Sequence, residues 1–521
     1  MKILLACALA GALFLSCRNN EKPAIENDHA IKPTTPTVDY DGQIRLLAPH
    51  MPLVDSVISR YAQQSNIPGL AYGVVLNGKL IHAGFKGVAN IAGNVPVNNN
   101  TAFRIASMTK SFTTMAILIL RDQGKLSLDD PASKYVPEMA GMKYLTTDAP
   151  TITIRDLMTH RAGFPEDNPY GDRQLSDTDE ELMDLIKKGP ALSNVAGIKF
   201  EYSNLGISLL GTIIKNITGK PYQQFITENI FKPLGMEHTY WEYSKVPPNE
   251  LAHGYRWINN SHREEELLHD GSWGAMGGLL TTIDDFSKYM SIHLNAWPPR
   301  NGAELGPLKR SSIREMHQLW NVDAVNPNFS FPSGRPCPTV AGYGFGLGIV
   351  KDCLNRTFVG HGGGLPGFGS HWRILPEHGL GVAIFSNRTY AGWGGITLQI
   401  LDTLVALTGI KPYTVSSEVL EQRKNELMQF LPHWKEAEKS SIFAENFFAD
   451  NPIDTLRKIS TELFAKAGTV KEVTAMSPMN NLRGYFDIVG EKGKLRVFFT
   501  LSPEHAPGIQ AFNISELKDD Q

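Results

Sequence analysis

Ser107 and Lys110 are the two residues whose types and spacing most directly predict chemistry. They lie three positions apart, so a helix would place both on one face. Residues 115–120, just downstream, are six consecutive apolar residues, which predicts a helix buried on all sides. A buried lysine loses its proton more easily and can then accept the hydroxyl proton of a serine. We therefore predict Ser107, in the first turn of this helix, as a nucleophile and Lys110 as its base.

The serine-x-x-lysine spacing is short, and chance can produce it. It occurs at one other place in the chain, Ser515 and Lys518. That segment is polar and C-terminal, so no buried helix can desolvate its lysine. The apolar surroundings of Ser107 distinguish it from this second match.

Tyr202 and Asn204 offer a second set of catalytic groups, at the start of a helix expected over residues 204–218. A phenol can relay protons, and an amide can orient either Lys110 or an amide of the substrate. A tyrosine and an asparagine at this spacing also occur as an ordinary capping or packing pair. The sequence leaves both interpretations open.

A glycine-rich segment, His361 followed by Gly362, Gly363 and Gly364, comes directly after a predicted strand. Glycines let the backbone of a substrate lie close against the edge of a sheet. His361 can present a hydrogen-bond donor to that substrate. The simpler interpretation is a turn that needs glycine for its backbone alone.

In order and spacing, these three groups resemble the motifs of the serine β-lactamase and penicillin-binding protein superfamily, in particular class C β-lactamases and their esterase and D,D-peptidase relatives. Residues 157–163 and 277–285 are similar to framework segments of that family, and the resemblance covers about residues 45–410. It implies an α/β fold of the β-lactamase/transpeptidase type, in which a central antiparallel sheet is flanked by helices and joined by an all-helical subdomain.

The resemblance also implies a role for each matching residue. Ser107 would be acylated, Lys110 would assist as a base, and Tyr202 would protonate the leaving group and activate water. The residues expected to bind substrate or to form the oxyanion hole are Asn204, His361, Gly362, Gly363 and Gly364. The hole itself would use the N–H groups of Ser107 and Gly364, each worth about 3–4 kcal/mol. The implied reaction is acyl transfer followed by hydrolysis, without a cofactor or a metal ion.

His361 is a departure from class C β-lactamases, whose third motif usually reads Lys-Thr-Gly. A lysine there holds a permanent positive charge opposite the substrate carboxylate, whereas a histidine is close to neutral at pH 7. With a histidine at this position, the sequence resembles the carboxypeptidases, D-aminopeptidases and esterases of the superfamily. We therefore expect carboxypeptidase or esterase activity ahead of efficient β-lactam hydrolysis.

Other classes of hydrolase need motifs that the sequence lacks. An α/β-hydrolase needs a Gly-x-Ser-x-Gly turn at its nucleophile, and no serine of the chain lies in one. A zinc hydrolase needs His-Glu-x-x-His or a comparable cluster, which is also missing from the sequence. A lipoprotein that binds penicillin or cell-wall fragments as a sensor, without turnover, remains the alternative function.

The elements that must position these residues are visible in the apolar pattern. Two short apolar runs within residues 70–85 are separated by Asn77-Gly78, the strongest short signal for a β-hairpin. A residue pattern typical of helices follows from about 107 to 235, and patterns typical of strands return at 341–386. Strands at both ends with helices between them predict one domain whose two ends pair in a single sheet.

This catalytic domain is expected to cover residues 43–410. Within it, residues 343–349 alternate bulky side chains with glycines, which predicts a strand that carries side chains on one face and lets another element approach closely on the other. Residues 415–521 differ in pattern, since a stretch typical of helices is followed by a series of short predicted strands. They predict a separate small α+β domain without catalytic residues.

Residues 1–17 have the form of an export signal, because Lys2 precedes an apolar run that is too short to span a bilayer and that ends at Cys17. A small residue followed by cysteine resembles a bacterial lipoprotein signal, which implies a lipidated Cys17. A plain cleaved signal is the alternative, since Phe14 stands where leucine is usual. Residues 18–42 predict a flexible tether. We expect an exported protein that is periplasmic or at the cell surface and is anchored to the membrane through the lipid only.

The composition excludes several classes of protein. With 42% hydrophobic residues, the chain of 521 residues is too apolar to be disordered. Its 50 Lys+Arg against 53 Asp+Glu give a net charge of -3, so no strong field attracts nucleic acid or an anionic membrane. The expected partners are a small-molecule or peptide substrate and, through the anchor alone, the membrane. No nucleic acid is expected, and the oligomeric state is left open.

Two cysteines remain outside the signal segment, Cys337 and Cys353. In an oxidising compartment they can form a local disulfide. Neither has the spacing to a second cysteine or a histidine that a zinc site needs, so these cysteines are not expected to bind metal.

Overall fold

The computed structural model describes residues 39–304, 306–413 and 417–517, which form two compact units, 39–413 and 417–517. Within these ranges no helix is long and apolar enough to cross a membrane. The predictions for the signal segment, for Cys17 and for most of the tether lie outside the described residues. The tether was predicted to end too late, because helix α1 (Tyr40–Leu47) already begins inside it, capped by the side chain of Asp39.

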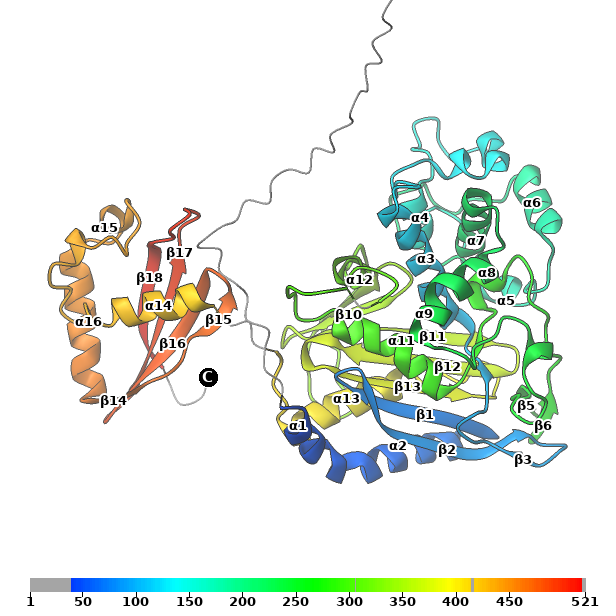
Figure 1. The fold of residues 1–521 in the computed structure, drawn as a ribbon, viewed down its shortest axis with the longest axis horizontal. Helices are drawn as coiled ribbons and strands as arrows, with labels where there is room; N and C mark the ends of the chain where they lie inside the picture. Colours follow the sequence, from blue (N-terminus) through cyan, green and yellow to red (C-terminus); the bar gives the residue numbers. More distant parts are fainter. Residues whose placement is uncertain (1–38, 305, 414–416, 518–521) are drawn as a thin grey trace, which may run out of the picture. The chain divides into compact units, whose positions relative to one another are not determined.

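An antiparallel sheet forms the centre of the larger unit, with the strand order β3-β2-β1-β13-β12-β11-β10-β9-β8 (Figure 1). The strands are β1 (Gly69–Leu76), β2 (Lys79–Asn90), β3 (Val95–Pro96), β8 (Asn321–Asn326), β9 (Thr339–Tyr343), β10 (Gly348–Asp352), β11 (Thr357–Leu365), β12 (Phe368–Leu375) and β13 (Leu380–Ser386). Strand β1 pairs with β13, with Leu70 opposite Ser386. The two ends of the unit therefore meet in one sheet, as predicted.

The turn between β1 and β2 explains how the chain enters this sheet. Asn77 and Gly78 have φ angles of 50° and 82°. Positive φ at both central residues defines the tight hairpin turn that asparagine and glycine favour. The predicted hairpin is confirmed.

Helices cover both faces of the sheet: α2 (Met51–Gln64), α13 (Gly394–Thr408) and α11 (Ile283–Asn295). The first two lie on one face and α11 lies on the other (Figure 1). Side chains of β1 alternate accordingly, with Tyr72 and Val74 in the cluster with α2 and α13 and Ala71 and Val75 in the cluster with α11. Burial on both faces explains why β1 is a continuous apolar run.

A helical subdomain lies on the side of the sheet away from α2 (Figure 1). Its helices are α3 (Lys110–Asp122), α4 (Ile154–Met158), α5 (Asn168–Gly171), α6 (Asp179–Lys188), α7 (Asn204–Thr218), α8 (Tyr222–Ile226) and α9 (Lys232–Leu234). Shorter elements of the unit are β4 (Phe103–Arg104), β5 (Tyr255–Ile258), β6 (Ser261–Glu264), α10 (Gly274–Gly277), β7 (Leu280–Thr281) and α12 (Arg310–Met316).

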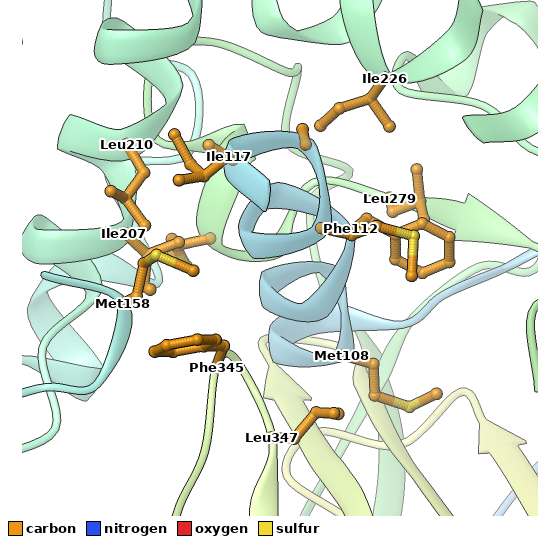
Figure 2. Packing of buried hydrophobic residues seen from close by; sticks show 14 of the residues in the cluster. Met108, Phe112, Ile117, Met158, Ile207, Leu210, Ile226, Leu279, Phe345 and Leu347 are labelled. Carbon is orange, nitrogen blue, oxygen red and sulfur yellow. The ribbon is translucent and has the colours of Figure 1, made fainter. Parts of the chain in front are cut away.

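Helix α3 is the centre of this packing. It is buried at every position from Lys110 to Leu120. Figure 2 shows Met158 of α4, Ile207 of α7 and Phe345 of the loop between β9 and β10 on one side of this helix, and Leu279 on the other. The prediction of a helix buried on all sides is confirmed.

The predicted single strand over residues 343–349 is wrong. Strand β9 ends at Tyr343 and β10 begins at Gly348, so the segment is a turn between two strands. Gly346 has φ +67°, and a Cβ there would lie 2.8 Å from the carbonyl oxygen of Lys110. The close approach of another element that the glycines predicted does occur, with the start of α3, but at a tight turn and not along a strand.

The smaller unit combines helices with a sheet in which β14-β16-β17-β18 are neighbours and β15 pairs with β16. Its elements are α14 (Glu418–Leu427), α15 (Phe447–Asp450), α16 (Ile453–Ala467), β14 (Val470–Val473), β15 (Ser477–Asn480), β16 (Arg483–Gly490), β17 (Lys494–Leu501) and β18 (Ile509–Leu517). The core of this unit contains the fully buried Trp434. The α+β architecture agrees with the expectation.

Cys337 and Cys353 form a disulfide with a Cα–Cα distance of 5.4 Å. The two cysteines flank the paired strands β9 and β10, so the bridge closes the end of this hairpin that is farther from the β9–β10 turn.

Candidate active site

Ser107 lies in a short 3-10 turn, Ala106–Thr109, that leads directly into α3. The preceding residue, Ala106, has φ +51°, a left-handed conformation that alanine rarely adopts. Strain of this kind persists where the surrounding structure enforces it, often at functional sites. The sequence predicted the first turn of an α-helix, whereas the tighter turn observed places Ser107 in the wall of a pocket.

Lys110 has no solvent exposure, and its Nζ has three oxygen acceptors. They are the Oγ of Ser107 at 2.9 Å, the Oδ1 of Asn204 at 2.7 Å and the carbonyl oxygen of Met276 at 2.9 Å. An ammonium can donate to all three. A neutral amine keeps two donors, which Asn204 and Met276 can accept, and its lone pair then points to Ser107. The geometry therefore directs the basic form of Lys110 at the serine hydroxyl.

Burial makes that basic form accessible. Burial lowers the pKa of Lys110 to about 7, against the opposing effect of the carboxylates Asp172 and Asp167. A substantial fraction of Lys110 is therefore neutral near pH 7, as a general base requires.

Tyr202 lies beside both residues. It lines the same pocket as Ser107, and its ring centroid lies 5.0 Å from the Nζ of Lys110. The ring of His160 packs on it, with centroids 4.3 Å apart. Burial raises the pKa of Tyr202, with the nearby hydroxyl of Ser107 acting in the opposite direction. The phenol is therefore protonated near pH 7 and can donate that proton.

Asn204 orients Lys110 and does not line the pocket. It is the first residue of α7, where the preceding Ser203 accepts a hydrogen bond from the N–H of Gly206. Asp167 Oδ1 also accepts a 2.6 Å hydrogen bond from the backbone N–H of Asn204. Of the two roles that the sequence left open for this amide, the structure shows the contact with Lys110.

His361 is on β11, and both of its ring nitrogens have partners within the protein. The Nδ1 lies 2.5 Å from the carbonyl oxygen of Gly362, so it carries the proton, and the Nε2 accepts from the hydroxyl of Tyr343 at 2.8 Å. Burial, followed by the nearby charge of Lys110, lowers the pKa of His361 to about 3. His361 lines the pocket as a neutral ring, but in this arrangement it does not present the free donor that the sequence predicted.

The three glycines after His361 do not share one role. Gly362 and Gly364 line the pocket, whereas Gly363 does not. A Cβ on Gly363 would lie 2.1 Å from the carbonyl oxygen of Ile105 and 2.4 Å from the Oγ of Ser370. The predicted contact of Gly363 with substrate is therefore replaced by a packing role, since glycine lets β11 approach the turn that carries Ser107.

The pocket has a volume of about 470 Å³, within the usual range for small-molecule sites. Its lining consists of Ser107, Asn168, Pro169, Asp172, Tyr202, His361, Gly362, Gly364 and Tyr390. The sequence did not indicate Asn168, Asp172 or Tyr390, because they lie outside any recognisable motif. Among the described residues, no group of three or more His, Cys, Asp or Glu side chains could hold a metal ion.

The fold and the geometry around Ser107 place the protein among the serine hydrolases of the β-lactamase and penicillin-binding protein superfamily. The Beta-lactamase family profile matches residues 54–406, and the chain belongs to this family.

Similar proteins of known sequence agree with this assignment. Protein flp of Staphylococcus aureus strain MW2 is 28% identical over 376 residues, which cover 72% of this chain and 70% of that protein. In strain COL the match spans 62% of the length of Protein flp. A Beta-lactamase of Pseudomonas fluorescens is 27% identical over 361 residues, 65% of this chain and 93% of that protein.

Among solved structures, the octameric penicillin-binding protein homologue from Pyrococcus abyssi has a TM-score of 0.56 and 22% sequence identity to this chain. The match covers 90% of this chain and 96% of that one. At this identity the likeness shows the fold.

Proposed function

We propose that the protein hydrolyses an amide or an ester through an acyl-enzyme on Ser107. The observation that carries this proposal is the completely buried Lys110, whose Nζ lies 2.9 Å from the Oγ of Ser107. Membership of the family supports serine hydrolase activity in general.

In acylation, the Oγ of Ser107 attacks the carbonyl carbon of the substrate while its proton passes to the neutral amine of Lys110. The carbonyl oxygen becomes an oxyanion, which we assign to the N–H groups of Ser107 and Gly364. The carbonyl then re-forms, and the leaving group departs with a proton from the phenol of Tyr202. The ammonium of Lys110 returns a proton to the tyrosinate.

In deacylation, a water molecule attacks the ester on Ser107. Tyr202 and Lys110 take up its proton and return a proton to the Oγ as the acid product leaves. The hydrogen bond between Lys110 and Ser107, and the position of Tyr202 in the same pocket wall beside Lys110, support a role for each in both half-reactions.

For the substrate, we propose D-peptides of the D,D-carboxypeptidase type and small esters ahead of β-lactams. The neutral state of His361 supports this order, because burial lowers its pKa to about 3 and leaves no cation at this position for the carboxylate of a β-lactam. The D,D-peptidase and esterase relatives of class C β-lactamases are the branch that this histidine resembles.

The test is a substrate panel of nitrocefin, p-nitrophenyl acetate, a D-Ala-D-Ala peptide and a D-alanine anilide, with the wild type and Ser107→Ala. We expect turnover of an ester or a D-peptide by the wild type and none by the variant, with unchanged thermal unfolding. Rates like those of the wild type in Ser107→Ala would overturn the mechanism. Stoichiometric labelling by penicillin without any turnover would support a sensor instead.

We also propose that the protein is exported and anchored by a lipid on Cys17, and that residues 415–521 form an accessory domain. The sequence of residues 1–17 supports the first proposal. Metabolic labelling with a radioactive fatty acid should mark the wild type and not Cys17→Ala. Equal labelling of the two proteins, or wild type retained in the cytoplasm, would contradict it.

A further inference from the structure

Asp172 is a buried carboxylate in the wall of the Ser107 pocket and is 1% exposed. It follows the last residue of α5, and its backbone N–H donates to the carbonyl oxygen of Asn168. Its Oδ2 accepts a 2.9 Å hydrogen bond from the hydroxyl of Tyr390. Its Oδ1 is buried and has no hydrogen-bond partner among the described residues. A buried carboxylate oxygen without a partner is costly, so its position needs a reason.

Asp167, five residues earlier, shows what a structural carboxylate looks like in the same loop. Its Oδ1 accepts from the N–H of Asn204 at 2.6 Å and its Oδ2 from the N–H of Leu205 at 2.9 Å. Both oxygens therefore serve the N-terminus of α7. Asp172 has a partner on Oδ2 alone, the hydroxyl of Tyr390, and its Oδ1 has none among the described residues.

The charges around the pocket favour a positive ligand. Asp172 is the one acidic or basic side chain in the lining apart from His361, which is neutral. Lys110 already directs its Nζ at three protein oxygens. Burial raises the pKa of Asp172 to about 6, with the Tyr390 hydrogen bond and the charge of Lys110 opposing this shift. The carboxylate is therefore ionised in most molecules at pH 7.

We propose that Asp172 binds an ammonium group of the substrate, so that the amide or ester cleaved at Ser107 carries a free amino group. This inference rests on the proposed function and narrows its substrate class to amino-acyl or amino-terminal peptide derivatives. The ammonium donates a charge-assisted hydrogen bond to the unpartnered Oδ1. Tyr390 acts as a positioning residue, because its hydroxyl holds Oδ2 and fixes the carboxylate.

A competing role for Asp172 is to act only through Lys110, whose pKa it raises. The two roles differ in what they predict. A residue that only tunes the base changes the rates of all substrates alike and shifts their pH profile. A residue that binds an ammonium changes the ratio between a substrate that has this group and one that lacks it.

The experiment compares kcat/KM at pH 7 for alanine p-nitroanilide, in both enantiomers, with that for p-nitropropionanilide, which lacks only the ammonium. We expect the wild type to hydrolyse one enantiomer of alanine p-nitroanilide with a kcat/KM at least about tenfold higher than that for p-nitropropionanilide. Asp172→Asn should lose this preference for the substrate with the ammonium. Tyr390→Phe should lose part of it. The matched control is Glu166→Gln, which removes an exposed charge from the same loop and should keep the preference within about twofold.

Thermal unfolding shows whether Asp172→Asn is folded, and a second measurement covers the case in which neither anilide is hydrolysed. Calorimetric titration of Ser107→Ala with alaninamide and propionamide should show tighter binding of alaninamide, lost when Asp172→Asn is added. Equal losses for both anilides, or equal binding of both amides, would overturn the inference while Ser107-dependent ester hydrolysis still stands. Absence of any Ser107-dependent acylation would defeat the proposed function separately.

Discussion

The carboxylate of Asp167 binds the backbone N–H of Asn204 at 2.6 Å, and the side chain of Asn204 in turn accepts from Lys110 at 2.7 Å. A loop residue thus fixes the start of α7, and the start of α7 fixes the base. The same loop continues through α5 to Asp172 in the wall of the pocket. One segment of chain therefore contributes both to the position of the base and to the wall of the pocket.

Replacing Asp167 tests this link. Asp167→Ala leaves two N–H groups at the start of α7 without their carboxylate, which should cost about 1–2 kcal/mol in the free energy of unfolding. It should also slow acylation, because Asn204 then holds Lys110 less firmly. Urea unfolding and the rate of labelling by a fluorophosphonate measure the two effects. Asp184→Ala on the exposed face of α6 is the control and should change stability by less than about 0.5 kcal/mol.

The pH dependence of kcat/KM should report the protonation of Lys110. Burial lowers its pKa to about 7, and only the neutral amine can accept the proton of Ser107. The rate should therefore rise with pH through about 7 and level off above it. Asp172→Asn, which removes a second group that titrates nearby, should retain a rising limb. Lys110→Met should lose the limb together with at least about 100-fold in rate, and a limb that persisted there would assign it to another group.

His361 should remain neutral through the physiological range. Its pKa lies at about 3 because the ring is buried and close to the charge of Lys110. The ¹⁵N signals of the ring should show the Nδ1-protonated neutral form from pH 8 to pH 5, and loss of these signals in His361→Asn would assign them. A titration midpoint near 6.5 would show instead that the site can hold a positive charge.

Gly363→Ala should displace the backbone near Ser107 without placing a new side chain in the pocket wall. A Cβ there would lie 2.1 Å from the carbonyl oxygen of Ile105, so β11 or the turn before Ser107 must move. We expect a loss of about 1–3 kcal/mol in unfolding free energy and slower fluorophosphonate labelling. Gly362→Ala is the control for stability alone, because Gly362 lines the pocket and its nearest atom is the Cδ2 of His371 at 3.3 Å. Equal stability of the two variants would argue against the packing role.

Those parts of the fold that depend on local signals could be predicted from the sequence. Asn77-Gly78 marks a hairpin because both residues accept positive φ, and the apolar run at 115–120 marks a helix with no solvent face. Residues 343–349 could not be assigned in the same way. Their alternation fits a strand or a glycine-rich turn, and the deciding contact of Gly346 is with a helix more than 200 residues away in the chain.

The residues of the candidate site also differ in whether a local sequence pattern reveals them. Ser107 and Lys110 are visible because their contact follows from helical spacing. Two hydrogen bonds of the pocket, between His361 and Tyr343 and between Asp172 and Tyr390, join separate segments of the chain. No local sequence pattern predicts them. The sequence therefore indicated the nucleophile and its base, whereas the charge and hydrogen bonding of the pocket required the fold.

The most direct test of the account is the site of covalent modification. Wild-type protein treated with a fluorophosphonate should gain one adduct by intact-protein mass spectrometry, and peptide mapping should place it on Ser107. Ser107→Ala should gain none, and Lys110→Met should react at least about 100-fold more slowly. An adduct on another residue, or equal labelling of wild type and Ser107→Ala, would contradict the assignment of Ser107 as the nucleophile.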